Sequence, residues 1–236
     1  REIRKVKSKN YKVGAAVGAG DLESKRALAI IKEKIDLIVV DTAHGHTKKV
    51  LTMIKKIKKK LKNSTLCVGN IATGKAAKFL ADSGVDIVKV GIGPGSICTT
   101  RLVAGIGVPQ LSAVMDVKKA LKKYKTKIIS DGGIKFSGDL AKAVAAGADA
   151  IMIGSLFSGT TESPGKIIRY KGKLYKNFRG MGSVGAMSAG SADRYYQKKS
   201  KDITKYVPEG VEGMVKFKGS VKDIIYNLVG GLKSSM

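Results

Sequence analysis

One cysteine in this chain stands in a setting that suits nucleophilic chemistry. Cys98 follows a glycine-rich turn at residues 91–95 and has three hydroxyl side chains close to it in sequence, those of Ser96, Thr99 and Thr100. Glycines let backbone amides approach a bound group, and a thiol beside them can attack an electrophilic carbon. The segment therefore predicts a covalent catalytic site next to a phosphate-bearing ligand with a planar ring. A structural turn with an inert thiol is the alternative.

Two further glycine-containing turns follow apolar runs. Asp131 precedes Gly132 and Gly133, and Gly154 precedes Ser155. Backbone amides at such strand ends often bind phosphate in α/β barrels. Together with Ser96 these turns predict a nucleoside monophosphate site, in which Asp131 binds the ribose hydroxyls. Asp41, at the end of another apolar run, could bind a second ribose.

Other chemistry-bearing residues have simpler interpretations. His44 and His46 lack a third ligand, so they are expected to be loop residues rather than metal ligands. Cys67 lies inside an apolar run and is expected in the core. Arg194 stands between an acid and two tyrosines, which fits either an ordinary salt bridge or a functional group of a mobile segment.

The composition limits the possible partners. The chain has 236 residues, 43% of them hydrophobic, and a formal net charge of +27. The basic residues accompany apolar residues at helical spacing, as in residues 50–62, where Val50, Ile54, Ile57 and Leu61 form one stripe. The lysines are therefore expected on solvated helix faces, and nucleic acid is not expected as the main partner. No apolar run approaches the roughly 18 residues of a membrane span, so no membrane partner and a cytoplasmic location are expected.

Apolar, β-branched runs alternate with helical patterns, which predicts repeated βα units around a parallel sheet. The expected strands are Val13–Gly18, Asp36–Thr42, Thr65–Asn70, Ile87–Gly91, Ile128–Asp131 and Ala150–Ser155. The expected helices are Leu22–Lys34, Thr47–Leu61, Gly74–Ser83, Asp116–Tyr124, Ser137–Ala146 and Val221–Leu232. The pattern favours an α/β fold of the (β/α)8 TIM-barrel type with about six units present; a doubly wound sheet is the alternative.

We expect residues 1–236 to form one catalytic barrel domain that is incomplete at both ends. Residues 163–219 interrupt the βα rhythm with glycine-rich and charged sequence that carries several tyrosines. Long insertions of this kind are often working lids, so this segment is expected to be an active-site lid.

The motifs resemble those of the bacterial type of inosine-5'-monophosphate dehydrogenase over essentially the whole chain. The matching segments are residues 39–46, 68–70, 91–101, 131–134, 154–155, 179–183, 193–195 and 207–210. The resemblance implies a (β/α)8 barrel, usually a homotetramer, that oxidises IMP to XMP with NAD and a potassium ion. It implies that a cysteine attacks purine C2, hydride passes to NAD, and the lid then closes to activate water.

The resemblance also implies a role for each matching residue. The catalytic residues would be Cys98, Thr100, Arg194 and Tyr195. Substrate would be bound by Ser96, Asp131, Gly133, Gly154, Ser155, Phe178, Met181, Gly182 and Glu209. The dinucleotide would be bound by Asp41, Asn70, Gly91 and Gly93, and potassium by the carbonyls of Gly93, Gly95 and Cys98. Arg194 as a base would be unusual, because a free guanidinium stays protonated.

The chain departs from the family in two respects. Phe178 stands where relatives usually have a tyrosine whose hydroxyl reaches the phosphate, so IMP affinity is expected to be lower. The family's first two barrel units, its regulatory modules and a C-terminal potassium-site segment lie outside these residues. A polypeptide made of these 236 residues alone is therefore expected to be inactive.

Two other functions remain open. GMP reductase shares the barrel and the cysteine loop, but it carries a catalytic glutamate where Val184 aligns and lacks the Asp-Arg-Tyr motif of residues 193–195. A noncatalytic nucleotide or nucleic-acid binder with the same fold is the second rival.

Overall fold

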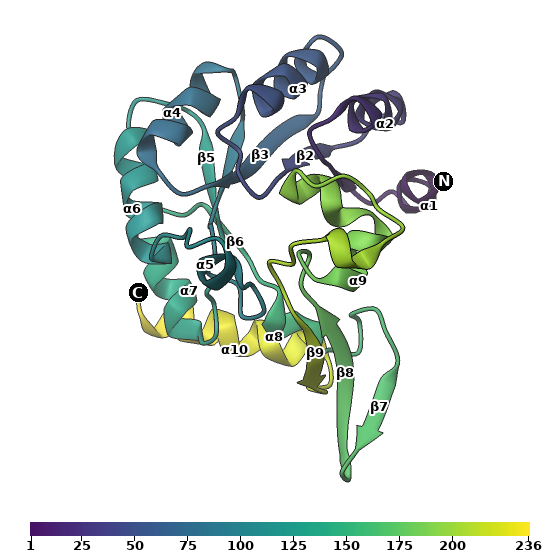
Figure 1. Ribbon diagram of the computed structural model, residues 1–236. Coiled ribbons are helices and arrows are strands. Elements are labelled where there is room, and N and C mark those ends of the chain that lie inside the picture. The colour runs from purple at the N-terminus through teal and green to yellow at the C-terminus, as the bar shows by residue number, and fades with distance from the viewer.

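The computed structural model describes residues 1–236, and its main sheet follows the predicted βα rhythm (Figure 1). Six parallel strands form one curved sheet in which each pairs with the next along the chain. They are β1 (Gly14–Val17), β2 (Leu37–Asp41), β3 (Thr65–Ile71), β4 (Ile87–Val90), β5 (Lys127–Asp131) and β6 (Ala150–Met152). The helices outside the curve are α2 (Asp21–Lys32), α3 (Lys48–Lys58), α4 (Gly74–Asp82), α6 (Gln110–Ala120) and α7 (Ser137–Ala145). The fold is therefore the predicted TIM-barrel type with six βα units.

The core lies between the sheet and these helices and contains 27 buried side chains. Helix α3 shows how the sequence produces it. Val50, Ile54 and Ile57 are at most 1% exposed, whereas Lys55 and Lys58 are exposed. Each fully buried aliphatic side chain contributes about 1.5–3 kcal/mol, so the predicted apolar stripe holds α3 against the sheet and leaves its lysines in solvent.

Helix α6 begins at Gln110 rather than at the predicted Asp116. Leu111 and Met115 in its first turns are exposed, so they obscured the apolar periodicity on which the prediction rested. The residues of α6 that are buried are Ala113, Val114 and Val117.

Residues 163–219, which the sequence predicts to be a lid and which are called the lid below, contain regular secondary structure that the sequence did not predict. The strands β7 (Ile167–Tyr170), β8 (Lys173–Arg179) and β9 (Glu212–Lys216) form an antiparallel sheet that projects from the body in Figure 1. Between β8 and β9 lie α9 (Val184–Ala186), η1 (Met187–Ser191), η2 (Ala192–Tyr195) and η3 (Ile203–Lys205). The strands escaped prediction because they are mostly exposed and lack apolar alternation; in β8 the only fully buried side chain is Lys176.

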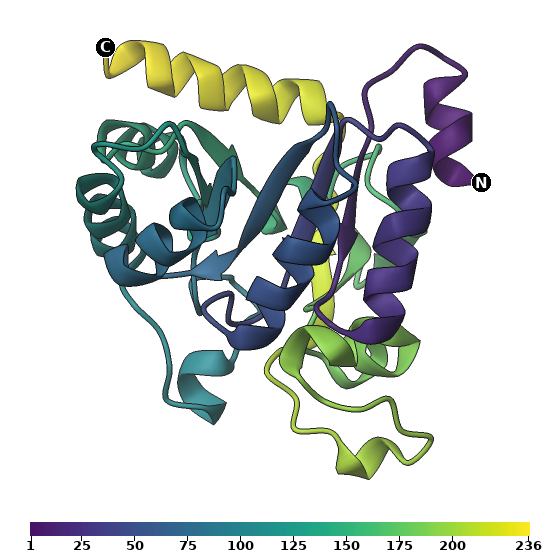
Figure 2. The ribbon, with the colours of Figure 1, turned by 90° about the horizontal axis from the view of Figure 1, so that it is seen from above.

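The remaining helices are α1 (Glu2–Lys7), α5 (Thr100–Val103), α8 (Ser155–Ser158) and α10 (Val221–Ser234). Figure 2 shows α10 running across one end of the molecule, where it packs against α7 and α8. Its position agrees with the predicted Val221–Leu232. None of the helices has both the length and the apolarity that crossing a membrane would require.

Candidate functional site

Four polar or glycine positions meet at one edge of the sheet. Asp41 ends β2, Asn70 lies near the end of β3, Gly91 follows β4 and Asp131 ends β5. These strands are neighbours and parallel, so their carboxyl ends lie at the same edge. This is the edge at which barrel enzymes place their active sites.

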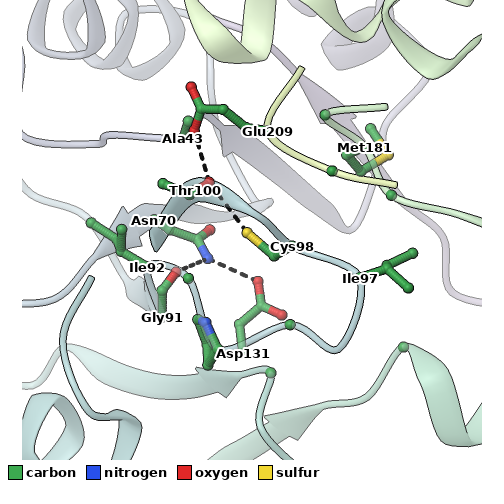
Figure 3. A pocket seen from close by; sticks show the side chains of 18 of the residues that line it. Ala43, Asn70, Gly91, Ile92, Ile97, Cys98, Thr100, Asp131, Met181 and Glu209 are labelled. Carbon is green, nitrogen blue, oxygen red and sulfur yellow. Dashed lines mark hydrogen bonds between the residues drawn. The ribbon is translucent and has the colours of Figure 1, made fainter. Parts of the chain in front are cut away.

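A cavity of about 260 Å³ opens at this edge (Figure 3), close to the lower end of the range for small-molecule sites. It brings together most of the residues that the sequence singled out, namely Asn70, Gly91, Gly93, Gly95, Cys98, Thr100, Asp131, Gly154, Phe178, Met181, Gly182, Arg194, Tyr195 and Glu209. Barrel loops and lid residues thus share one pocket.

Four predicted site residues do not line this cavity. Ser96 is exposed and Ser155 begins α8. Gly133 lines a neighbouring cavity beside α6 and α7, and Asp41 lines another, together with Arg194. Conversely, Arg179 lines the main cavity, although no site role is predicted for it from the sequence.

A chain of hydrogen bonds runs from the cysteine to a carboxylate of the lid. The Sγ of Cys98 donates to Thr100 Oγ1 over 3.2 Å, and that hydroxyl donates to Glu209 Oε2 over 2.7 Å. The backbone holds the same two segments together, because Thr99 N–H donates to the carbonyl of Glu209 over 2.9 Å. A carboxylate at the end of such a chain can receive the thiol proton and so activate the sulfur as a nucleophile.

Lys89 connects two of the predicted site residues and is not singled out by the sequence. Its side chain is 3% exposed, and its Nζ lies 3.0 Å from Asp41 Oδ1 and 2.5 Å from Asp131 Oδ2. It also donates to the side-chain oxygen of Asn70, whose Nδ2 donates to Asp131 Oδ2 over 3.0 Å. The available signal was a lysine in the middle of the apolar strand Ile87–Val90, because a buried charge requires partners.

Residues 192–197 of the lid, the lid tip, lie against the end of β2. The guanidinium of Arg194 forms an ion pair with Asp41, and Ala43 N–H donates to the carbonyl of Arg194 over 2.8 Å. Burial would raise the pKa of Asp41, but the charges of Lys89 and Arg194 hold it below its ordinary value. Burial opposes the charge of Arg194 too, yet Asp41 raises its pKa. In this conformation Arg194 is therefore a paired cation.

The glycines of the cysteine loop are required by packing within the protein. Gly91 has φ +152°, and a Cβ there would lie 2.1 Å from the carbonyl oxygen of Asp131. Gly93 has φ +83°, and a Cβ there would lie 2.7 Å from Arg101 Cγ. Both positions need glycine for the loop to form, whether or not a ligand approaches the backbone.

The interpretation of Cys67 as a core residue is confirmed. Its side chain is 0% exposed, and burial raises the pKa of the thiol to about 12. His46 packs on Phe79 with 4.6 Å between the ring centroids, as expected of a residue that shapes the loop.

The family model described as "IMP dehydrogenase / GMP reductase domain" matches residues 1–236. The chain is 54% identical over 226 residues to the inosine-5'-monophosphate dehydrogenase of Aquifex aeolicus, covering 95% of this chain and 46% of the relative. It is also 54% identical over 225 residues to that of Rhizobium tropici, covering 95% and 45%.

A solved structure shows the same fold. The crystal structure of a GMP reductase variant from Trypanosoma brucei in complex with guanosine 5'-monophosphate matches with a TM-score of 0.86 and 43% identity, over 95% of this chain and 46% of that one. The chain thus spans about half the length of the relatives it matches. On the match of the family model to every residue and the identity to curated relatives, the chain belongs to the IMP dehydrogenase / GMP reductase domain family.

Proposed function

We propose that the protein containing this chain oxidises IMP to XMP with NAD, through a covalent bond between Cys98 and purine C2. The observation that carries the proposal is the Cys98–Thr100–Glu209 hydrogen-bond chain, which lies in a cavity that the lid tip also lines. The names of the relatives with 54% identity support this choice within the family.

In the first half-reaction the chain activates the sulfur. The thiol proton passes to the Thr100 hydroxyl as that hydroxyl gives its own proton to Glu209, which leaves a thiolate. The thiolate forms a bond to C2, and the hydrogen on C2 leaves with its electron pair. NAD, when bound, supplies the acceptor for that hydride.

Substrate binding is assigned to groups around the same cavity. Asp131 is oriented by Lys89 and Asn70 and would accept hydrogen bonds from the ribose hydroxyls. The Gly154–Ser155 turn, with Ser96 and Gly133, would hold the phosphate through N–H and hydroxyl groups. Met181, Gly182 and Glu209 would contact the hypoxanthine ring.

In the second half-reaction water replaces the sulfur at C2 while the lid is closed. Arg194 and Tyr195 line the cavity that contains Cys98. Burial raises the pKa of Tyr195, and Asp41 raises that of Arg194, so neither is a free base in this conformation. We propose that water enters between Arg194 and Asp41 and that the guanidinium orients this water by donating a hydrogen bond to its oxygen. The carboxylate of Asp41 takes the water proton as the water oxygen bonds to C2, and the sulfur leaves as the Cys98 thiolate.

Asp41 fits a dinucleotide as well as the lid. A carboxylate at a strand end suits the hydroxyls of a ribose, and Asn70, Gly91 and Gly93 lie beside it at the same edge. Because Arg194 contacts that carboxylate here, the dinucleotide and the closed lid would use Asp41 in turn.

We propose potassium as the second cofactor, held by the carbonyls of Gly93, Gly95 and Cys98. Neutral carbonyl oxygens suit a potassium ion, and the three belong to a single turn. The resemblance to the family further supports a cytoplasmic homotetramer, in which residues 163–219 act as the lid of one catalytic domain.

The test compares two reactions of the full-length natural protein. Incubation with IMP and NAD should produce NADH and XMP, and Cys98→Ala should abolish turnover while IMP binding persists. Cys67→Ala is the matched control and should retain turnover, because that thiol is buried in the core and does not line the cavity. IMP binding without turnover in either reaction would indicate the noncatalytic binder instead.

GMP reductase is the second candidate, because the solved structure that matches this chain is a GMP reductase bound to GMP. Incubation with GMP and NADPH tests it directly. Consumption of NADPH, without NADH formation from IMP and NAD, would replace our proposal with this one.

A further inference from the structure

The lid tip is fastened to the barrel by a residue next to the predicted catalytic pair. Tyr196 Oη donates to the carbonyl of His44 over 2.5 Å and lies 3.3 Å from Thr47 Oγ1. The two partners belong to the loop of residues 42–47 that joins β2 to α3, and they lie 152 and 149 residues away in sequence.

The donors and acceptors of this contact are mutually consistent. The single hydroxyl proton of Tyr196 is used on the His44 carbonyl, so Thr47 donates to Tyr196 Oη. Thr47 can still accept the hydrogen bond from Val50 N–H that caps α3. Lys49 adds a cation–π contact, with its Nζ 5.8 Å from the centroid of the Tyr196 ring.

The backbone of Tyr196 adopts a strained conformation that directs its side chain toward this contact. Its φ is +58°, in the left-handed region that large side chains rarely adopt. This conformation ends the 3-10 helix Ala192–Tyr195, so Arg194 and the Tyr196 side chain both reach residues 41–47. The hydrogen bonds to His44 and Thr47 offset the strain only while the lid is closed.

We propose that the Tyr196 hydroxyl is the latch of the lid, a positioning residue that sets how often Asp41 is free for the dinucleotide. The proposal rests on the proposed function, because it assigns Asp41 alternately to the dinucleotide and to Arg194. A stronger latch favours the closed, hydrolytic state and weakens apparent NAD binding, since affinity falls with the fraction of molecules in the competent state.

The test removes the hydroxyl and keeps the ring. The hydroxyl takes part in two hydrogen bonds, each of which contributes about 0.5–1.5 kcal/mol, so in Tyr196→Phe the equilibrium between closed and open lid should shift roughly 5- to 150-fold toward open. Tyr226→Phe is the matched control, because that tyrosine is 81% exposed on α10.

The first readout needs no activity. Ala43 N–H donates to the carbonyl of Arg194, so hydrogen exchange of the Ala43 amide in ligand-free protein reports lid opening. Exchange should accelerate by the stated factor in Tyr196→Phe and remain unchanged in Tyr226→Phe. Equal exchange in both variants overturns the latch, even if the protein proves to have another activity.

The second readout is kinetic. In Tyr196→Phe the KM for NAD should fall, the rate of the first-turnover NADH burst at saturating NAD should stay the same, and hydrolysis of the covalent intermediate should slow. If the Tyr196 hydroxyl only stabilised the fold, Tyr196→Phe would lower the rates of all steps together. If exchange shifts as expected but IMP and NAD give no turnover, the latch stands and the proposed function fails.

Discussion

Arg194 and Asp41 form an ion pair, although one belongs to the lid and the other ends β2. The ion pair is largely buried, with the side chains 15% and 22% exposed. Asp41 also contacts Lys89, so the closed lid is electrostatically connected to the carboxylate of Asp131 through one ammonium group.

Selective alkylation should separate the two cysteines. Burial raises the pKa of Cys67 to about 12, so almost no thiolate forms there at neutral pH, whereas Cys98 is partly exposed. Iodoacetamide should add one group per chain, located at Cys98 by peptide mass spectrometry. Cys98→Ser should take up none, and labelling of Cys67 in the folded protein at a comparable rate would contradict the prediction.

Replacement of Lys89 should reveal its coupling to Asp131. Removing one partner of a buried pair typically costs about 3–5 kcal/mol, so Lys89→Met should markedly lower the free energy of unfolding, measured in urea. Lys89→Met combined with Asp131→Asn should cost less than the sum of the two single changes, because the double variant leaves one fewer unpaired charge. Strict additivity would show that the two residues do not interact.

Gly18 should be a steric requirement for lid closure. A Cβ at this position would lie 2.0 Å from Asp193 Oδ2. The φ of Gly18 is not in the left-handed region, so alanine would clash only when the lid is closed. Gly18→Ala should accelerate exchange of the Ala43 amide. In an Asp193→Ala background the same change should have little effect, and an undiminished effect there would place the cause elsewhere.

Lid closure should depend on pH through two carboxylates whose protonation has opposite effects. Partial burial, followed by the charge of Glu23, raises the pKa of Asp193, with Arg26 nearby acting the other way. Protonation of Asp193 on mild acidification therefore favours closure. The lowered pKa of Asp41 means that its ion pair is fully present above the ordinary aspartate pKa of about 3.9 and is lost only as pH falls through the lowered value.

Protection of the Ala43 amide, corrected for intrinsic exchange, should therefore pass through a maximum in mild acid. Asp193→Asn should remove the rise on the neutral side and retain the loss at low pH. Protection that does not change from neutral pH into mild acid in the unmodified protein would contradict the role given to Asp193.

A hydroxyl on Phe178 should strengthen IMP binding. Its Cζ lies 3.9 Å from the position of a Cβ built on Gly154, so a para hydroxyl would extend near the turn proposed to hold the phosphate. A hydrogen bond to a charged group contributes about 1.5–3 kcal/mol, so Phe178→Tyr should lower the Kd for IMP by about one to two orders of magnitude in calorimetry. Phe136→Tyr, at a side chain that is 73% exposed, should leave it unchanged.

The amino-acid sequence by itself determined the fold class and the kinds of chemistry. Strands such as Leu37–Asp41 and helices such as Lys48–Lys58 are apparent from local periodicity, and the residues around Cys98 form one continuous motif. Elements without such periodicity were missed: the lid strands β7, β8 and β9 are mostly exposed, and their order depends on pairing between distant segments.

Only the tertiary structure decided which groups meet. Thr100 and Glu209 are 109 residues apart, and Lys89 joins Asp41 to Asp131 because β2, β3, β4 and β5 are neighbours in one sheet. The sequence predicts that the glycines of the loop let a bound group approach the backbone, whereas at Gly91 it is the carbonyl of Asp131 that lies where a Cβ would be. Residue types fix what each group can do, whereas strand order, register and lid closure fix its partners, because those contacts arise only when the chain folds.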